Sequence, residues 1–121
     1  MEAHKLGVME TKFAELIWQN APLPSGEIVK LCFAEFGWKK STTYTMLRRL
    51  CDRGIFRNID GTVSVLLSQQ EFQALQSGQF INETFDGSLP KFLASFMSRA
   101  KLSEREIDEL QRIISEHKEE V

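Results

Sequence analysis

Hydrophobic residues recur at helical spacing in the first part of the chain. From Leu6 to Trp18 they fall at positions 6, 9, 13, 16 and 17, the spacing of a helix with one apolar face. The stretch Asn20-Ala-Pro-Leu-Pro ends this helix because proline cannot continue it. A second helix is predicted from Ser25, acting as N-cap, to Gly37, which closes it in a left-handed conformation. Its expected buried stripe is Ile28, Val29, Cys32 and Phe36.

The helix predicted over residues 41–53 has two very different faces when successive residues are turned by about 100°. The side expected to face the core carries Thr43, Met46, Leu47, Leu50 and Cys51. The opposite side carries Ser41, Thr45, Arg48, Arg49 and Asp52, flanked by Thr42 and Tyr44. One face is therefore predicted to pack, and the other to meet solvent or a ligand.

A β-hairpin is predicted after this helix. Asp60-Gly61 lies between two β-favouring runs, which indicates antiparallel strands over residues 55–59 and 62–67. Three short helices followed by a hairpin is the order of a winged helix-turn-helix. The predicted fold class is mostly α with a small β-hairpin, a winged helix-turn-helix followed by C-terminal dimerisation helices.

The C-terminal part returns to helical periodicity. Helices are predicted over residues 69–84, over 89–97, and after the capping box Ser103-x-x-Glu106. We divide the chain into a winged-helix domain, residues 1–68, and a helical dimerisation region, residues 69–121. A segment below about 60 residues buries too little surface to be stable alone, so its apolar stripes are expected to pair with a second copy in a symmetric homodimer. The expected interface is Leu89, Phe92, Leu93, Phe96, Ile107, Leu110, Ile113 and Ile114; the alternative is that these helices fold back on the winged domain.

Composition narrows the class of protein. The 121 residues are 42% hydrophobic and 26% charged, typical of a folded globular chain. Neither a membrane-spanning run nor a signal peptide is apparent, so we expect a cytoplasmic protein without membrane insertion. The two cysteines, Cys32 and Cys51, fall in apolar helical patterns and are interpreted as reduced core thiols, with redox or metal sensing as the alternative.

Charge is concentrated in one block. Residues 37–57 carry six basic side chains against Asp52 alone, a net charge of +5, whereas residues 1–36 carry −2 and residues 58–121 carry −5. Such asymmetry indicates a local site for a polyanion. The alternative is a solvated helix face.

Enzyme chemistry is not indicated. His4 and His117 lie near the two ends of the chain, outside any motif, and are interpreted as surface residues. No phosphate-binding loop, nucleophile motif or metal-ligand spacing occurs, so we expect no cofactor and no metal site.

The helix over 41–53 instead has the features of a DNA-recognition helix. Hydroxyl groups near its start can read base edges in the major groove, and cations at its margins can neutralise phosphates. The candidate DNA-binding residues are Lys39, Lys40, Ser41, Thr42, Tyr44, Thr45, Arg48, Arg49 and, from the wing, Arg57. Structural roles are the alternatives for three of them: Ser41 as a helix cap, Tyr44 half-buried against the core, and Arg48 paired with Asp52.

The chain resembles the penicillinase and methicillin-resistance repressor family (BlaI/MecI type) over nearly its whole length. The most specific stretches are "GWKKSTTYTMLRRLCDRG" and "LSEREIDEL". The resemblance implies a homodimeric winged-helix repressor of double-stranded operator DNA, contacting it at Ser41, Thr42, Tyr44 and Thr45. It also implies relief of repression by a membrane-sensor protease pathway, with Ser95-Phe96 standing where the resistance repressors have the cleaved Asn-Phe bond. The rival hypothesis is a winged-helix protein-interaction module without sequence-specific DNA binding.

Overall fold

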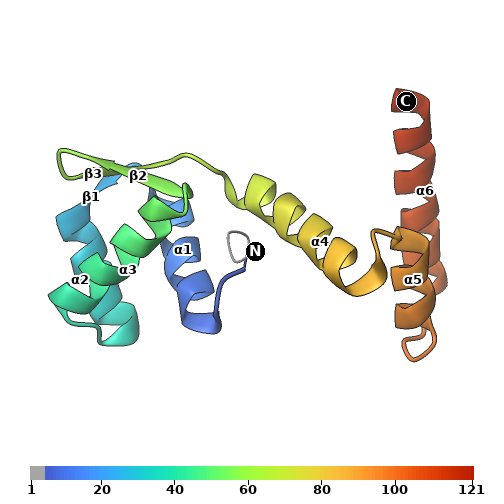
Figure 1. Ribbon diagram of the computed structural model, residues 1–121, viewed down its shortest axis with the longest axis horizontal. Helices are drawn as coiled ribbons and strands as arrows, with labels where there is room; N and C mark the ends of the chain where they lie inside the picture. The colour runs from blue at the N-terminus through green and yellow to red at the C-terminus, as the bar shows by residue number, and fades with distance from the viewer. Residues whose placement is uncertain (1–4) are drawn as a thin grey trace. The chain divides into compact units, whose positions relative to one another are not determined.

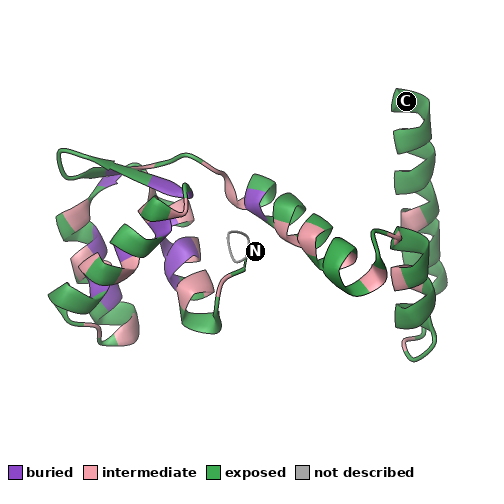
Figure 2. Ribbon diagram, in the orientation of Figure 1, coloured by how far each residue is buried: buried purple, intermediate pink, exposed green. Residues whose placement is uncertain are grey.

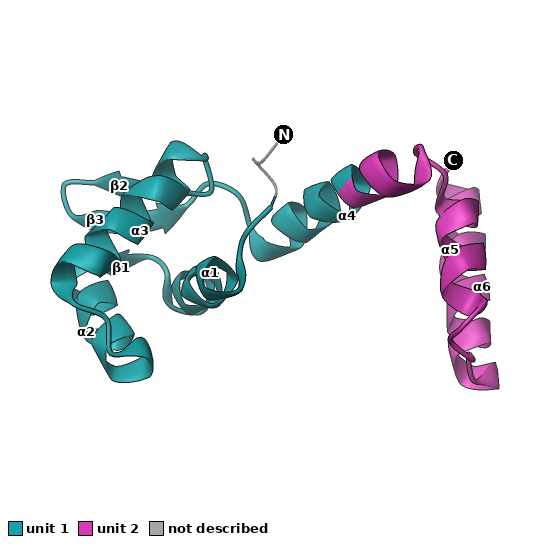
Figure 3. Ribbon diagram, turned by 60° about the horizontal axis from the view of Figure 1, so that its bottom comes forward, with its two compact units in different colours: residues 1–79 teal, residues 80–121 magenta. Residues whose placement is uncertain are grey.

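The computed structural model describes residues 5–121 and divides the chain into two compact units, residues 1–79 and 80–121 (Figure 3). Over the described residues there are six helices and a three-stranded antiparallel sheet (Figure 1). The elements are α1 (Val8–Asn20), β1 (Leu23–Pro24), α2 (Ser25–Phe36), α3 (Lys40–Asp52), β2 (Phe56–Ile59), β3 (Thr62–Val65), α4 (Gln69–Phe85), α5 (Leu89–Met97) and α6 (Glu104–Glu120). The predicted fold class, mostly α with a winged helix-turn-helix, is confirmed. Within the described range, no helix is both long enough and apolar enough to cross a membrane.

The turn between α2 and α3 begins as predicted at Gly37, which adopts φ 68° and donates its N–H to the Phe33 carbonyl oxygen at 3.0 Å. This left-handed conformation suits glycine because it lacks a Cβ. Trp38 then packs its ring 5.6 Å from Phe13 and 5.0 Å from Phe36, centroid to centroid. The start of α3 is therefore held against α1 and α2.

The wing has one more strand than the sequence predicted. Asp60 and Gly61 both have positive φ, 51° and 85°, as the predicted tight turn requires, and β2 pairs with β3. However, β1 pairs with the other side of β3, which gives the order β1-β3-β2. Two residues are too few to show a strand periodicity, and proline is tolerated there because β1 lies at the edge of the sheet.

The core of the first unit draws on all of its helices and on the sheet (Figure 2). Its fully or almost fully buried side chains include Phe13, Ile17, Ile28, Cys32, Leu47, Leu50, Ile55, Phe56 and Val63. Burial raises the pKa of the Cys32 and Cys51 thiols, because desolvation disfavours the thiolate. Val29 and Phe36, predicted as buried, are only partly buried.

Trp18 fixes the beginning of α4. Its indole N–H donates to the Leu67 carbonyl oxygen at 3.0 Å, and its ring lies 5.8 Å from that of Phe72 and 5.6 Å from that of Phe56. Phe72 is 3% exposed, so the first turn of α4 belongs to the core of the first unit.

The second unit packs around a small aromatic cluster. The rings of Phe80, Phe85 and Phe92 lie 5.4 to 6.0 Å apart in edge-on geometries that aromatic pairs prefer. The capping box predicted at Ser103 is confirmed: its Oγ accepts the Glu106 N–H at 3.1 Å, and Glu106 Oε1 accepts the Ser103 N–H at 3.2 Å.

Glu10 ties α1 to the end of α3. Its Oε1 accepts the Gly7 N–H at 2.9 Å, and its Oε2 lies 3.5 Å from Arg49 Nη1 and 3.9 Å from Arg53 Nη1. The backbone hydrogen bond from Gly7, followed by the charges of Arg53 and Arg49, holds the pKa of Glu10 below its ordinary value despite its burial.

Replacing Glu10 with Gln tests this link. The amide oxygen keeps the Gly7 bond, but the ion pairs are lost, so we expect a loss of about 1 kcal/mol in the free energy of unfolding at about pH 7. A lowered folded-state pKa stabilises the fold above the unfolded pKa, so the difference from wild type should shrink as the pH falls through the folded pKa of Glu10. Urea denaturation against pH measures it, with the exposed Glu35→Gln as control. A difference that persists unchanged in acid contradicts the account.

Candidate nucleic-acid interface

The two faces of α3 are separated as the sequence predicted. Thr43, Leu47 and Leu50 are buried, with 1%, 2% and 0% of their surface exposed. The exposed residues in the same stretch include Lys39, Lys40, Ser41, Thr42, Thr45, Arg48 and Arg49. We call the exposed side of this stretch the α3 face. Hydrogen-bonding groups and cations are thus presented together on a helix whose other side is locked in the core.

Ser41 does not cap α3. The helix begins at Lys40, and Lys39 is the N-cap, without a side-chain hydrogen bond to the helix. Ser41 is therefore the second residue of the helix, two positions after the N-cap. The side chain of Thr43 bonds to the preceding turn, because its Oγ1 donates to the Lys39 carbonyl oxygen at 3.2 Å. Ser41 is exposed, so its hydroxyl is accessible to a ligand.

The arginines on α3 differ in their partners. Arg49, expected to contact phosphate, is half exposed and forms the ion pair with Glu10 described above. Within residues 5–121, the structure gives Arg48 and Asp52 no ion pair with each other, although both are exposed. A phosphate could bind Arg48 without displacing Asp52. Arg49 would have to exchange the Glu10 carboxylate for a phosphate.

Tyr44 is half-buried, which is the alternative to DNA contact that was considered for it from the sequence. Its Oη lies 3.1 Å from Ser25 Oγ, and Lys40 Nζ lies 6.0 Å from the centre of its ring. Ser25 is the first residue of α2 rather than its N-cap, which is Pro24. This contact was missed, because nothing in the sequence links positions 25 and 44.

Arg57 adds a cation from the wing. It is exposed on β2, opposite Ser64 of β3 in the strand register. The first unit therefore contains the α3 face and a basic wing residue, the two elements with which winged helices contact a duplex.

No three His, Cys, Asp or Glu side chains of residues 5–121 could hold a metal ion together. His117 is exposed on α6, and His4 lies outside the described residues.

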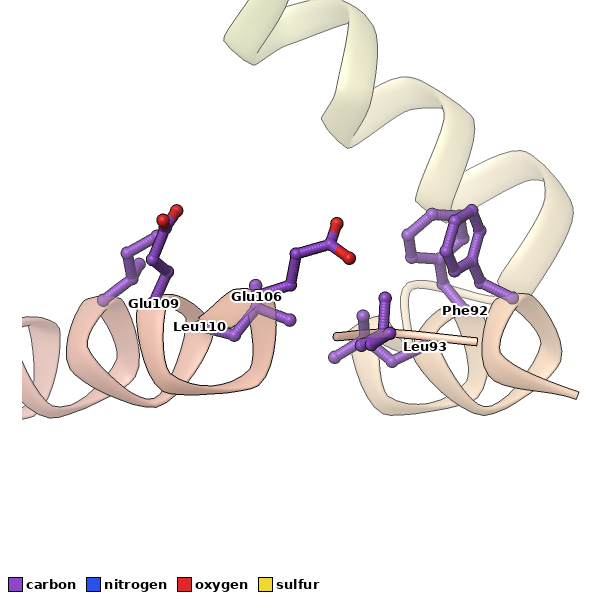
Figure 4. A pocket seen from close by; sticks show the side chains of 8 residues that line it. Phe92, Leu93, Glu106, Glu109 and Leu110 are labelled. Atoms are coloured by element: carbon purple, nitrogen blue, oxygen red, sulfur yellow. The ribbon is translucent and has the colours of Figure 1, made fainter. Parts of the chain in front are cut away.

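The second unit exposes a long apolar surface on α5 and α6. Neither helix has a buried residue, and Leu89, Phe96, Ile113 and Ile114 are 50–61% exposed. A cavity of about 290 Å³ opens between the two helices (Figure 4). Its lining is Phe92, Leu93, Phe96, Leu102, Glu106, Glu109, Leu110 and Ile113. An apolar surface that is exposed along two amphipathic helices is typical of a protein–protein interface.

The chain is similar in sequence to known repressors over most of its length. The penicillinase repressor family matches residues 6–116. The penicillinase repressor of Bacillus licheniformis is 28% identical over 113 residues, covering 90% of this chain and 88% of its own. The methicillin resistance regulatory proteins MecI of Staphylococcus aureus Mu50 and of Mammaliicoccus sciuri are 24% and 23% identical over 118 residues, covering 94% of this chain and 96% of theirs. This winged-helix chain therefore belongs to the penicillinase repressor family, a family of transcriptional repressors rather than enzymes.

Proposed function

We propose that the chain is a cytoplasmic homodimeric repressor that holds a pseudo-palindromic operator through the α3 faces of its two copies. The observation that carries this proposal is the α3 face itself: exposed hydroxyls and cations on one side of a helix whose other side is buried. Such a helix fits the major groove, and two copies would meet half-sites about 34 Å apart or a multiple of it. Repression would follow because the bound dimer blocks access of polymerase to the promoter.

We assign two kinds of contact to the α3 face and the wing. Ser41, Thr42 and Thr45 are the proposed base readers, because their short hydroxyl side chains are exposed near the start of the helix. Lys39, Lys40, Arg48, Arg49 and Arg57 are the proposed phosphate contacts. The proposal assigns DNA binding to residues 1–68 and dimerisation to residues 69–121.

The apolar surface of α5 and α6 is the proposed dimer interface. It consists of Leu89, Phe92, Leu93, Phe96, Ile107, Leu110, Ile113 and Ile114. Two such surfaces would cover each other, and the pairing would tether two weak half-site contacts into one strong one.

Proteolysis is the proposed route of release. Ser95 and Phe96 lie within α5, and Phe96 is 50% exposed. Cleavage between them by a membrane-sensor protease pathway would separate α6 from the DNA-binding part and remove five of the eight proposed interface residues. The dimer would lose its tether, and each DNA-binding part would fall back to half-site affinity.

Two substitutions separate base reading from phosphate binding. Thr45→Ala should relax preference at one base pair, by about 1–3 kcal/mol, without changing the fold. Lys40→Ala should weaken binding to all duplexes alike and reduce the slope of log affinity against log salt by about 1. Binding titrations against a selected duplex and its scramble, each at several salt concentrations, measure both effects. Unchanged preference in the first variant, or an unchanged slope in the second, contradicts the assignment of that residue.

Ile113→Glu tests the interface. Ile113 is 56% exposed and lines the cavity between α5 and α6, so the substitution would place an unpaired carboxylate in the proposed contact. We expect the dimer to weaken by about 3 kcal/mol, or about a hundredfold in dissociation constant. Gln111→Glu, exposed on the same helix, introduces the same charge as a control. Sedimentation velocity over a concentration series reports the result, and an intact Ile113→Glu dimer rules out this interface.

A further inference from the structure

Ser25 connects the wing to the recognition helix. Its backbone N–H donates to the Gly61 carbonyl oxygen at 2.7 Å, in the turn between β2 and β3. Its side-chain Oγ lies 3.1 Å from the Tyr44 hydroxyl oxygen on α3. One residue thus touches both of the elements proposed to contact DNA.

The position of Ser25 is determined from several directions. The preceding residue, Pro24, pairs with Thr62 in the sheet. The turn that accepts the Ser25 N–H is itself held, because Gly61 donates its N–H to Asn58 Oδ1 at 3.1 Å. The Ser25 hydroxyl is therefore presented to Tyr44 by a preorganised backbone rather than by a free loop.

The hydroxyl pair of Ser25 and Tyr44 has one O–H that their mutual hydrogen bond does not use. Each hydroxyl carries one proton, and the bond between Ser25 and Tyr44 uses only one of the two. Within residues 5–121, the structure gives neither hydroxyl another hydrogen bond. The remaining O–H can donate to an outside acceptor, and it is a stronger donor because its oxygen already accepts a hydrogen bond.

The charge beside the pair favours an anionic acceptor. Lys40 Nζ lies 6.0 Å from the centre of the Tyr44 ring. Glu27, an acidic residue in the first turn of α2, is ion-paired with Lys30 at 3.4 Å. An oxygen anion near Tyr44 would therefore meet a donor proton and an ammonium group.

We propose that Ser25 is a positioning residue for DNA recognition, which holds the Tyr44 hydroxyl as a donor to a backbone phosphate and so takes Tyr44 out of base readout. This inference rests on the proposed function, because it needs a duplex on the α3 face. It revises the role expected for Tyr44 from the sequence, where the residue stood among the base readers. Tyr44 would determine how the helix is seated, while Thr45 and its neighbours determine sequence.

The test compares Tyr44→Phe, Ser25→Ala and the double variant on a selected duplex, on its single-base variants and on its scramble. Tyr44→Phe should lose about tenfold in affinity on every duplex, because a hydrogen bond to a charged group is lost. The salt slope should stay unchanged, because a hydroxyl displaces no counterion. Ser25→Ala should reproduce most of this loss, and the double variant should lose little more, because the two hydroxyls act as one unit. Ser25→Thr, which keeps a hydroxyl, should restore wild-type affinity.

Three results would overturn the inference. They are a Tyr44→Phe loss confined to one base-pair position, additive losses in the double variant, and no loss in either single variant. Thr45→Ala serves as the matched control, since it removes an exposed hydroxyl that is expected to act at one base pair only.

If the wild-type protein itself shows no preference between the selected duplex and its scramble, the proposed function fails. In that case the affinities of Tyr44→Phe and wild type can still be compared on either duplex. Failure of the proposed function is therefore distinguishable from failure of the Tyr44 phosphate contact. Circular dichroism confirms that each variant is folded.

Discussion

Burial of one side of α3 fixes the orientation of this helix and therefore the side chains that it exposes. Because Thr43, Leu47 and Leu50 are enclosed by the core, the helix cannot rotate about its axis, and the opposite side chains must point outward. The same packing restricts the choice of ligand, because the exposed side combines hydroxyls with cations and lies in the stretch of net charge +5. The Glu10 ion pairs and the Trp38 ring contacts hold the two ends of α3. A rigid helix of this kind is suited to a duplex, whose groove requires fixed spacing rather than adaptable side chains.

The second unit is organised by a different constraint. An aromatic cluster built from Phe80, Phe85 and Phe92 supplies its internal packing, but α5 and α6 leave most of their apolar side chains in water. A helical segment this small cannot cover its own apolar surface. A second copy would cover it and would also supply the second α3 face that a pseudo-palindromic operator requires. Dimerisation and DNA binding would then be coupled. Loss of the interface would weaken DNA binding without altering the base-reading residues.

Much of the fold follows from local rules in the sequence. The periodicity of α3 correctly separated its buried and exposed sides, and Asp60-Gly61 identified the hairpin because both residues adopt positive φ. The features that sequence reasoning missed depend on tertiary position. Ser41 was considered as a cap because the start of the helix was placed one residue late, and β1 is too short to have a pattern. The contact between Ser25 and Tyr44 joins residues 19 positions apart, and no local rule pairs them.

Recognition of an operator by paired α3 faces is tested by selecting bound fragments from a pool of duplex DNA with the purified protein. We expect recovery of an inverted repeat with half-site centres about one helical turn, or a multiple of it, apart. That repeat should be bound at least about 10³-fold more tightly than its scramble at physiological salt. Recovery of no motif, or salt-sensitive binding that is equal for the two duplexes, would contradict recognition of an operator by paired α3 faces and would favour a protein-interaction module.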